Sequence, residues 1–206
     1  VYYRLHVSDI GWMGWAKNGE PAGTQGYAKS AEAIQLVLVQ KDGRAPDSSD
    51  SATEDAFRKK PLGISYQAHV SNIGWTGYVS DGNTVGTTGR ALPMEAVKAS
   101  LTNTNLGEGE EGCIRLSAHV SEIGWMDWAT GTAGTTGQHK SMEAIKAKLD
   151  GNIATHYDLY YRVHCAGFGW LGWTKNGGEA GTSGLSCPIE ALQIKLVKKG
   201  APAPNE

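Results

Sequence analysis

HVSDIGWMGW, residues 6–15, is the stretch that decides the fold, because the chain repeats it. Each copy continues through a turn into Ala-Gly-Thr-x-Gly or a close variant, then closes with Glu-Ala and an apolar segment. Such a period is typical of propellers, prisms and similar closed or stacked folds. The further copies of the opening stretch begin at His69, His119 and His164. The 206 residues are therefore four repeats of one unit.

The opening of each repeat predicts strands. Residues 1–7 are rich in β-branched and aromatic side chains, which favour a strand. Asn18-Gly19 in the first repeat and Asn176-Gly177 in the fourth indicate a tight hairpin turn, because both residue types tolerate positive φ. We expect a second strand after this turn. The two glycines of Ala-Gly-Thr-x-Gly indicate a bend where backbone packs closely.

The closing segment is ambiguous. Residues 141–149 would suit a helix by propensity alone. In the first and fourth repeats, however, apolar residues alternate with other residues at the period of a strand, as at Ile34, Leu36 and Leu38. We therefore expect a strand, and three to four short strands in each repeat.

These patterns predict one all-β domain over residues 1–206 with pseudo-fourfold repetition. The repeats span about residues 1–40, 64–101, 113–149 and 159–198. A small four-bladed β-propeller is the simplest arrangement, with one repeat in each blade. A β-trefoil-like ring with an extra copy and a β-prism-like arrangement are the alternatives, because the sequence does not decide strand order.

The segments between repeats are polar. Residues 41–63 form an insertion with many Asp, Glu and Ser residues, and residues 103–112 are acidic and glycine-rich. The motifs stay in register on both sides of the insertion. We expect it to be a surface loop outside the core, and replacing residues 42–60 by a short linker should change stability by no more than about 1 kcal/mol. Its polar residues could also contact a ligand or a second subunit.

The composition limits which binding partners and which cellular location we expect. The net charge of -2, with Lys and Arg spread along the chain, does not match the basic surface that nucleic acids require. The apolar runs are far shorter than the roughly 18 residues of a membrane span. The chain begins at Val1 with no signal peptide to be read, which is consistent with a processed, secreted protein. Secretion is an expectation only.

Three cysteines leave at least one thiol unpaired within a monomer. Cys165 and Cys187 both lie in the fourth repeat, which suggests either a disulfide across neighbouring strands or two buried free thiols. Cys113 fits a small apolar strand residue.

Positions that are identical in all four repeats are core candidates, because each repeat must bury the same face. The first tryptophan should bury a large apolar area with its N–H satisfied. These positions hold His6, His69, His119 and His164; Trp12, Trp75, Trp125 and Trp170; and Thr24, Thr87, Thr135 and Thr182. Four histidines could converge on an axis to hold a metal, but no Cys or Asp pattern accompanies them, so we predict no metal site and no cofactor.

Two positions vary in a way that suits binding. A flat aromatic side chain can stack on the C–H face of a sugar, and nearby Asp, Asn or Glu side chains can fix hydroxyl groups. Alternatively, the aromatics cover the outer edge of the core. The candidate carbohydrate-binding residues are the second aromatics Trp15, Tyr78, Trp128 and Trp173 and the polar residues Asp9, Asn72 and Glu122, with Gly167 at the equivalent place in the fourth repeat.

No catalytic motif stands out. The chain has no Gly-x-Ser-x-Gly, His-Glu-x-x-His or phosphate-binding Gly-x-x-x-x-Gly-Lys-Ser/Thr sequence. The repeated glutamates Glu32, Glu95, Glu143 and Glu190 are equivalent, whereas hydrolysis normally needs two carboxylates in different environments. We therefore expect no enzyme activity.

The pattern Tyr-x-x-His-Val-x-x-Ile-Gly-Trp-x-x-Trp-x-x-Asn-Gly-x-x-Ala-Gly-Thr-x-Gly resembles the ChW repeat, a hydrophobic repeat with a characteristic tryptophan described in clostridial surface proteins. The likeness covers nearly the whole chain outside the insertion and links. It is weaker in the second repeat, which has Tyr78 for the second tryptophan, and in the third, which lacks Asn-Gly. The resemblance implies a secreted or cell-surface protein that binds glycans or proteins, and it implies no catalytic residues.

Together these observations predict a multivalent lectin with up to four shallow sugar sites, whose partners are glycans or glycoconjugates. Several weak sites on one molecule raise avidity by roughly 10²–10⁴. The alternative is a cell-surface protein-interaction or structural module without sugar binding. Oligomers are possible.

Overall fold

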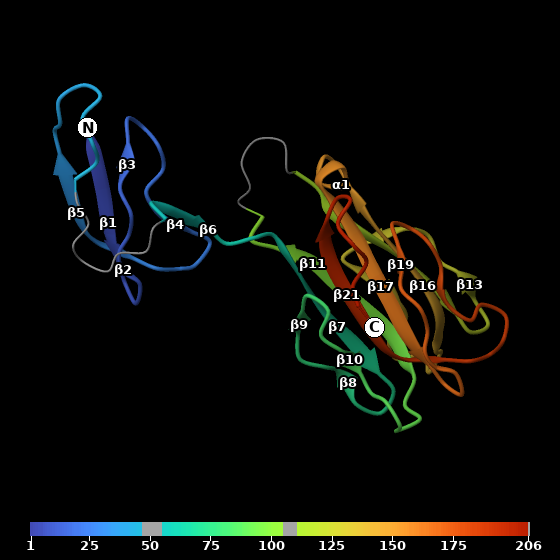
Figure 1. Ribbon diagram of the computed structural model, residues 1–206. Coiled ribbons are helices and arrows are strands. Elements are labelled where there is room, and N and C mark those ends of the chain that lie inside the picture. The colour runs from blue at the N-terminus through green and yellow to red at the C-terminus, as the bar shows by residue number, and fades with distance from the viewer. Residues whose placement is uncertain (47–54, 105–110, 206) are drawn as a thin grey trace. The chain divides into compact units, whose positions relative to one another are not determined.

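The computed structural model describes residues 1–46, 55–104 and 111–205. The chain divides into two compact units (Figure 1), a first unit Val1–Pro61 and a ring unit Leu62–Glu206. The first unit contains the first repeat, and the ring unit contains the other three. The sequence predicted a single domain over residues 1–206, whereas the structure contains these two compact units.

The chain is all-β, as predicted, with five strands in each repeat rather than three to four. The additional strands are only two or three residues long. The first strands are β1 (Tyr2–Val7), β7 (Gly63–Val70), β12 (Cys113–Val120) and β17 (Tyr157–Cys165). The second strands are β2 (Gly11–Trp12), β8 (Gly74–Trp75), β13 (Gly124–Trp125) and β18 (Gly169–Trp170). The third strands are β3 (Ala16–Lys17), β9 (Val79–Ser80), β14 (Ala129–Thr130) and β19 (Thr174–Lys175).

The fourth strand carries the Ala-Gly-Thr motif, and the fifth is the closing segment, whose strand assignment is confirmed. The fourth strands are β4 (Gly23–Gln25), β10 (Val85–Gly86), β15 (Thr132–Gly134) and β20 (Ala180–Gly181). The closing strands are β5 (Ala31–Val37), β11 (Met94–Thr102), β16 (Met142–Asp150) and β21 (Ile189–Lys198). In every repeat the first strand pairs antiparallel with the second, third and closing strands.

The turn after the third strand forms as predicted. Asn18 and Gly19 have φ values of 48° and 92°, and Asn176 and Gly177 have values of 50° and 91°. A strand follows this turn, also as predicted. Its partner was not foreseen, because the fourth strand pairs outside its own hairpin.

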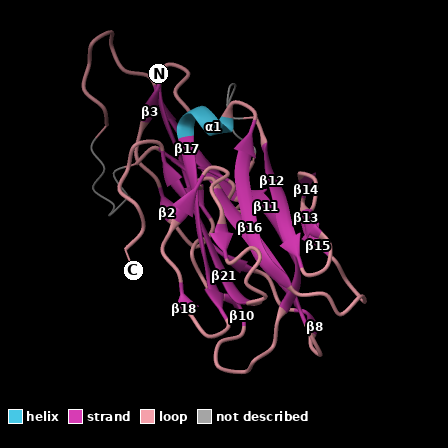
Figure 2. Cartoon of the chain, turned by 90° about the vertical axis from the view of Figure 1, so that its right-hand side faces the viewer, coloured by secondary structure: helices cyan, strands magenta, loops and turns pink. Residues whose placement is uncertain are grey.

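In the ring unit, each repeat gives its fourth strand to another repeat. β10 of the second repeat pairs with β21 of the fourth, β20 of the fourth pairs with β16 of the third, and β15 of the third pairs with β11 of the second. Three exchanges close a ring of three sheets, whose long strands run along the unit (Figure 2). The predicted four-bladed propeller is therefore not the observed arrangement, and the prism-like alternative describes the ring unit better.

The core of the ring unit lies between the three sheets. Alternate residues of the first strands point inward, as the period of a strand requires. Fully buried examples are Tyr66, Val70, Leu116, Val120, Tyr161 and Val163. The closing strands contribute the facing apolar residues, including Val97, Ile145, Leu192 and Ile194.

The glycine of the fourth strand is required by the exchange. A Cβ atom added to Gly86, Gly134 or Gly181 would lie 2.3 Å from a carbonyl oxygen of the neighbouring repeat. The following threonine N–H donates to that same carbonyl, as Thr182 N–H does to the Glu143 oxygen at 2.9 Å. The close backbone approach expected from the sequence is therefore confirmed in this unit.

Part of the insertion is a strand. β6 (Phe57–Lys59) pairs parallel with β4 in the first unit. The expected surface loop thus contributes to a sheet, and deleting residues 42–60 would remove a strand partner of β4. Residues 47–54 of the insertion and residues 105–110 of the acidic link lie outside the described residues.

The three cysteines are free thiols, so the suggested bridge between Cys165 and Cys187 is not formed in this structure. Cys165 is fully buried, and burial raises the pKa of its thiol to about 11. The described helix, α1 (Ile153–His156), packs the buried Ile153 between the third and fourth repeats. No helix in the described ranges is long and apolar enough to cross a membrane.

Candidate functional site

The outer face of each sheet carries a repeated histidine, tryptophan and glutamate. The His6 and Trp12 rings meet edge to face with centroids 5.3 Å apart, and the other three repeats have the same pair at 5.4 to 5.6 Å. The histidine Nδ1 lies 2.9 to 3.1 Å from an oxygen of the repeated glutamate. The histidines thus contact Glu32, Glu95, Glu143 and Glu190 of their own repeats and do not converge on an axis. No cluster of three metal-ligating side chains occurs in the described part of the chain.

Cations lie over the aromatic faces. In the fourth repeat, the guanidinium of Arg162 lies 5.0 Å from the centre of the Trp170 ring and 4.8 Å from that of Trp173. Arg4 is placed in the same way in the first repeat. In the second and third repeats, Lys98 and Lys146 lie over the first tryptophan. A cation therefore covers one face of each of these rings. The negative face of an aromatic ring attracts a cation in this position.

The second aromatics of the ring unit lie beside the turn of the next repeat. Trp173 lines a shallow hollow of about 340 Å³ together with Asp81, Gly82 and Asn83, which form the turn of the second repeat. Arg162, Gln193, Lys195 and Asn205 line its other sides. The Gln193 side-chain amide also donates to Thr84 Oγ1 across the boundary at 2.9 Å. The hollow therefore combines an aromatic ring with amide, carboxylate and cationic groups from two repeats.

The other two boundaries follow the same rule. Tyr78, which is 60% exposed, lines a hollow of about 220 Å³ with Lys98, Ser100 and residues 131–132 of the third repeat. Trp128 approaches the turn of the fourth repeat, where its ring lies 3.9 Å from the position that a Cβ on Gly177 would take. We call these three places the junctions. Each contains a second aromatic from one repeat and the turn of the next.

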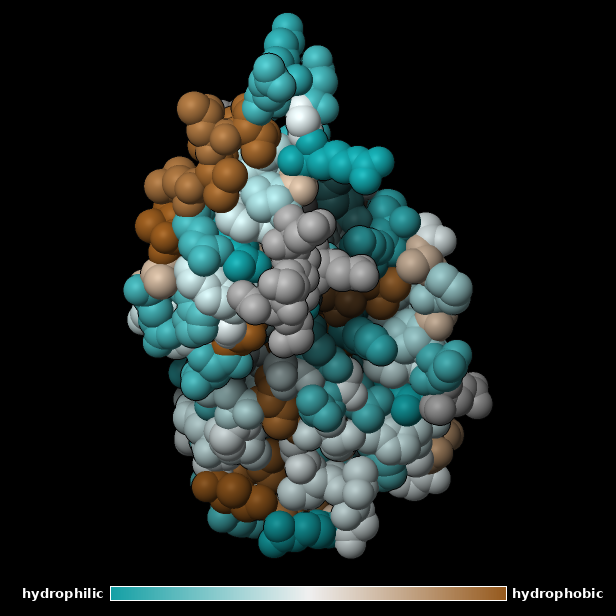
Figure 3. Space-filling model, turned by 60° about the vertical axis from the view of Figure 1, so that its left-hand side comes forward, coloured by the Kyte–Doolittle hydropathy of each residue, from teal (hydrophilic) through white to brown (hydrophobic). Residues whose placement is uncertain are grey.

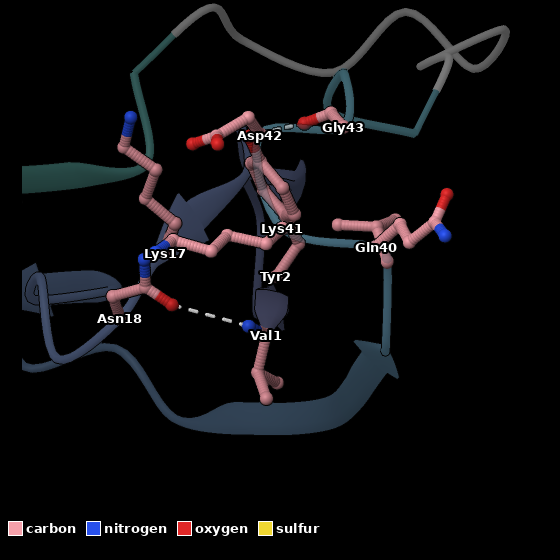
Figure 4. A pocket seen from close by; sticks show the side chains of 9 residues that line it. Val1, Tyr2, Lys17, Asn18, Gln40, Lys41, Asp42 and Gly43 are labelled. Atoms are coloured by element: carbon pink, nitrogen blue, oxygen red, sulfur yellow. Dashed lines mark hydrogen bonds between the residues drawn. The ribbon is translucent and has the colours of Figure 1, made fainter.

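Trp15 has no such junction within the first unit, because that unit contains a single repeat. Arg4 lies 4.7 Å from its ring centre. A hollow in the described part of this unit lies at the end of β1, with Tyr2, Lys17 and residues 39–43 around it (Figure 4). The dashed line in Figure 4 marks the hydrogen bond that the Val1 amine donates to Asn18 Oδ1 at 3.1 Å. Trp15 does not line this hollow.

The predicted polar residues do not join the second aromatics. Asp9, Asn72 and Glu122 occupy the turn after the first strand with φ values of 58°, 63° and 65°, and Gly167 has 79°. Asp9 binds Lys29 at 2.5 Å, and Glu122 binds Lys140 at 3.1 Å. A hydrogen bond from Lys29 lowers the pKa of the Asp9 carboxyl. Asp9, Asn72 and Gly167 are residue types that tolerate such a left-handed turn well, and Glu122 adopts the same conformation.

Sequence reasoning missed the residues that the neighbouring repeat supplies. One of these is Asn83, beside Trp173, which had no distinguishing motif of its own. Gln193 and Lys98 lie in the same repeat as Trp173 and Tyr78, respectively, and were missed as well. The Asn-Gly turn of the first and fourth repeats was predicted. The position of a turn beside an aromatic of another repeat depends on the exchange of strands, which no local pattern reveals.

Comparison with known proteins supports the repeat pattern. The family model described as "Clostridial hydrophobic W" matches four times, at residues 6–40, 69–103, 119–151 and 164–198. No curated protein and no solved structure matches the chain. Since the four matches cover more than half of the sequence, the chain belongs to the Clostridial hydrophobic W family and contains four of its repeats.

Proposed function

We propose that the chain is a multivalent carbohydrate-binding protein outside the cell, with its sugar sites at the junctions. The repeated placement of a second aromatic beside the polar turn of the next repeat carries this proposal. Sugars combine C–H faces, which stack on aromatic rings, with hydroxyl groups that amides and carboxylates bind. A hollow that offers both kinds of group suits such a ligand.

The junctions are shallow and alike, which suits binding through avidity. The Trp173 hollow is near the lower end of the range for small-ligand pockets, about 300–1,000 Å³. A single sugar unit would leave much of its surface in water and bind weakly. Three similar sites on one ring unit would bind a surface that presents many sugars far more tightly.

The cations over the rings favour a second candidate, a protein-interaction module of a cell surface. With one face of Trp173 covered by Arg162, the ring offers its other surfaces to a partner. Aromatic and arginine side chains are also enriched where proteins bind one another. A partner protein would be bound through the same residues but would not be displaced by free sugar.

Glycan-array binding followed by calorimetry with the best sugar tests the proposal. Tyr78→Ala should lower the number of bound sugars by about one per chain without changing stability, because Tyr78 is largely exposed. Ile73→Ala is the matched control, since Ile73 is an exposed apolar residue of the same repeat that does not line the hollow. Equal binding by both variants, or no sugar bound by the parent chain, would refute the assignment.

A further inference from the structure

The closing strand of the first repeat exposes side chains that its counterparts bury. Ile34, Leu36 and Leu38 are 57%, 64% and 83% exposed. In the fourth repeat the first two positions hold Leu192 and Ile194, which are at most 1% exposed. Figure 3 shows hydrophobic side chains, coloured brown, gathered at the surface on the side of the first unit. A cluster of large apolar side chains on one strand indicates a missing partner.

The outer edge of this strand is also unpaired within the described residues of the first unit. β5 pairs with β1. Its counterparts β11, β16 and β21 pair with their own first strand on one side and with a fourth strand from another repeat on the other. An exposed apolar strand with a free edge is prone to pair with another chain.

The first repeat carries the strand that would fill this edge. β4 begins within Ala22-Gly23-Thr24, which is the motif by which the other repeats exchange strands. β6 does not occupy the relevant edge. Gly23 N–H donates to Ala56 and Gln25 accepts from Lys60, so β6 uses the backbone groups of residues 23 and 25. Successive backbone groups of a strand point to opposite edges, which leaves Ala22 and Thr24 to face another strand, as Thr182 does.

We propose that three copies of this chain join through their first repeats to form a second ring of the kind seen in the ring unit. Each chain gives β4 to β5 of the next. The ring unit fixes the register, since Ala180 pairs with Ile145 and Val85 with Leu192. By the same register, Ala22 of one chain pairs with Ile34 of the next.

Further contacts of the ring unit have their counterparts in the first repeat. The buried Tyr66 hydroxyl accepts Ile194 N–H from another repeat at 3.1 Å and donates to Asn83 O of its own turn. Burial raises the Tyr66 pKa to about 12, so the hydroxyl stays protonated. Tyr3, at the same position, already donates to Glu20 O in its own turn. In the assembly its oxygen accepts Leu36 N–H from the next chain.

The assembly also completes the fourth junction, which matters for sugar binding only if the proposed function holds. Trp15 of each chain would lie beside the Asn18-Gly19 turn of the chain whose β4 it receives, as Trp128 lies beside Gly177 of the repeat that gives β20 to β16. The first repeat would then contribute a site that it does not contain alone.

Light scattering on the full chain tests the assembly without any sugar. The expected mass is three times the 21.9 kDa of one chain. Leu36→Lys should return the mass to one chain, because it places a charge in the shared core. Leu185→Lys is the matched control, since Leu185 is 62% exposed in the ring unit, and it should stay trimeric. A monomeric parent chain, or a trimeric Leu36→Lys variant, would overturn the proposal.

A disulfide test checks the register. The double variant Ala22→Cys and Ile34→Cys should give a covalent trimer on oxidation, because paired strand residues lie within the reach of a disulfide. Ala22→Cys with Leu38→Cys, which places the second cysteine out of register, should not. Cys113, Cys165 and Cys187 are present in both variants, so they cannot cause a difference. A covalent monomer from the first pair would show that the two strands meet within one chain and would overturn the exchange.

Discussion

The first repeat and the three repeats of the ring unit share a motif but differ in what they bury. The repeated glutamate shows this, since its side chain is 50% exposed in the first repeat and 5 to 8% exposed in the others. Strand order within the repeat is the same in all four. The difference therefore arises between repeats and not within them. A single repeat forms its sheet, but it needs two others to cover the closing strand.

The largest effect should come from shortening the same closing-strand side chain in the ring unit, where it is buried, and in the first repeat, where it is exposed. Ile194→Ala should lower the free energy of unfolding of the ring unit by about 2–5 kcal/mol, because it opens a cavity in a closed core. Leu36→Ala changes the equivalent residue of the first repeat, which is exposed. Measured by urea unfolding under dilute, monomeric conditions, it should change stability by less than about 0.5 kcal/mol. Equal losses would show that the first repeat is also covered in solution.

The sequence predicted the repeat well and the assembly poorly. The alternation at Ile34, Leu36 and Leu38 correctly predicted a strand, because side-chain period is a local property. The same alternation occurs at Leu192 and Ile194, where the outcome is burial. Pairing of Val85 with Leu192 joins residues far apart in the chain and depends on how many repeats close together. Four copies suggested a fourfold ring, but the motif sets only how neighbours pair.

The candidate site was predicted in part for the same reason. The second aromatics were chosen because one position varies between Trp and Tyr, and Trp173 and Tyr78 do line hollows. Asp9 was grouped with Trp15 by its nearness in sequence. In the structure it serves a left-handed turn and binds Lys29. Some polar groups of a junction, such as Asn83 beside Trp173, come from another repeat, which proximity in the sequence does not reveal.

A smaller, pH-dependent effect should distinguish the repeats within the ring unit. The fourth repeat buries Asp158, where the second repeat has Gly63. Burial opposes its ionisation, but hydrogen bonds from Lys199, Asn176 and Lys175 outweigh burial and lower its pKa below the ordinary 3.8. The folded chain therefore releases this proton more readily than the unfolded chain. The resulting stabilisation is fully present above the ordinary pKa and is lost as pH falls through the lowered one.

Asp158→Asn should thus lower the free energy of unfolding by about 1.5–3 kcal/mol at pH 7, the range for hydrogen bonds to charged groups. The cost should shrink as pH falls below 4. Urea unfolding of both proteins at pH 7 and pH 3 measures it. Asp127→Asn, which changes an exposed carboxylate of the third repeat, is the control and should show no such dependence. A cost that stays constant with pH would show that Asp158 acts through its shape rather than its charge.

The smallest effect should come from making the fourth repeat more like the others. Cys165 stands where the other repeats have Val7, Val70 and Val120, all buried to the same degree. Its raised pKa of about 11 keeps the thiol neutral near pH 7, so Cys165→Val removes no charge from the core. Since two apolar side chains of similar size are exchanged, the free energy of unfolding in urea should change by less than about 1.5 kcal/mol.

A disulfide between Cys165 and Cys187 would give another result, because losing a native bridge typically costs about 2–5 kcal/mol. A loss of that size, which a reductant also produced in the parent chain, would show that the bridge forms in solution and that the fourth repeat is stabilised differently from its neighbours. Equal stability with and without reductant would show that the ring closes by packing alone, with cysteine serving as a small apolar residue.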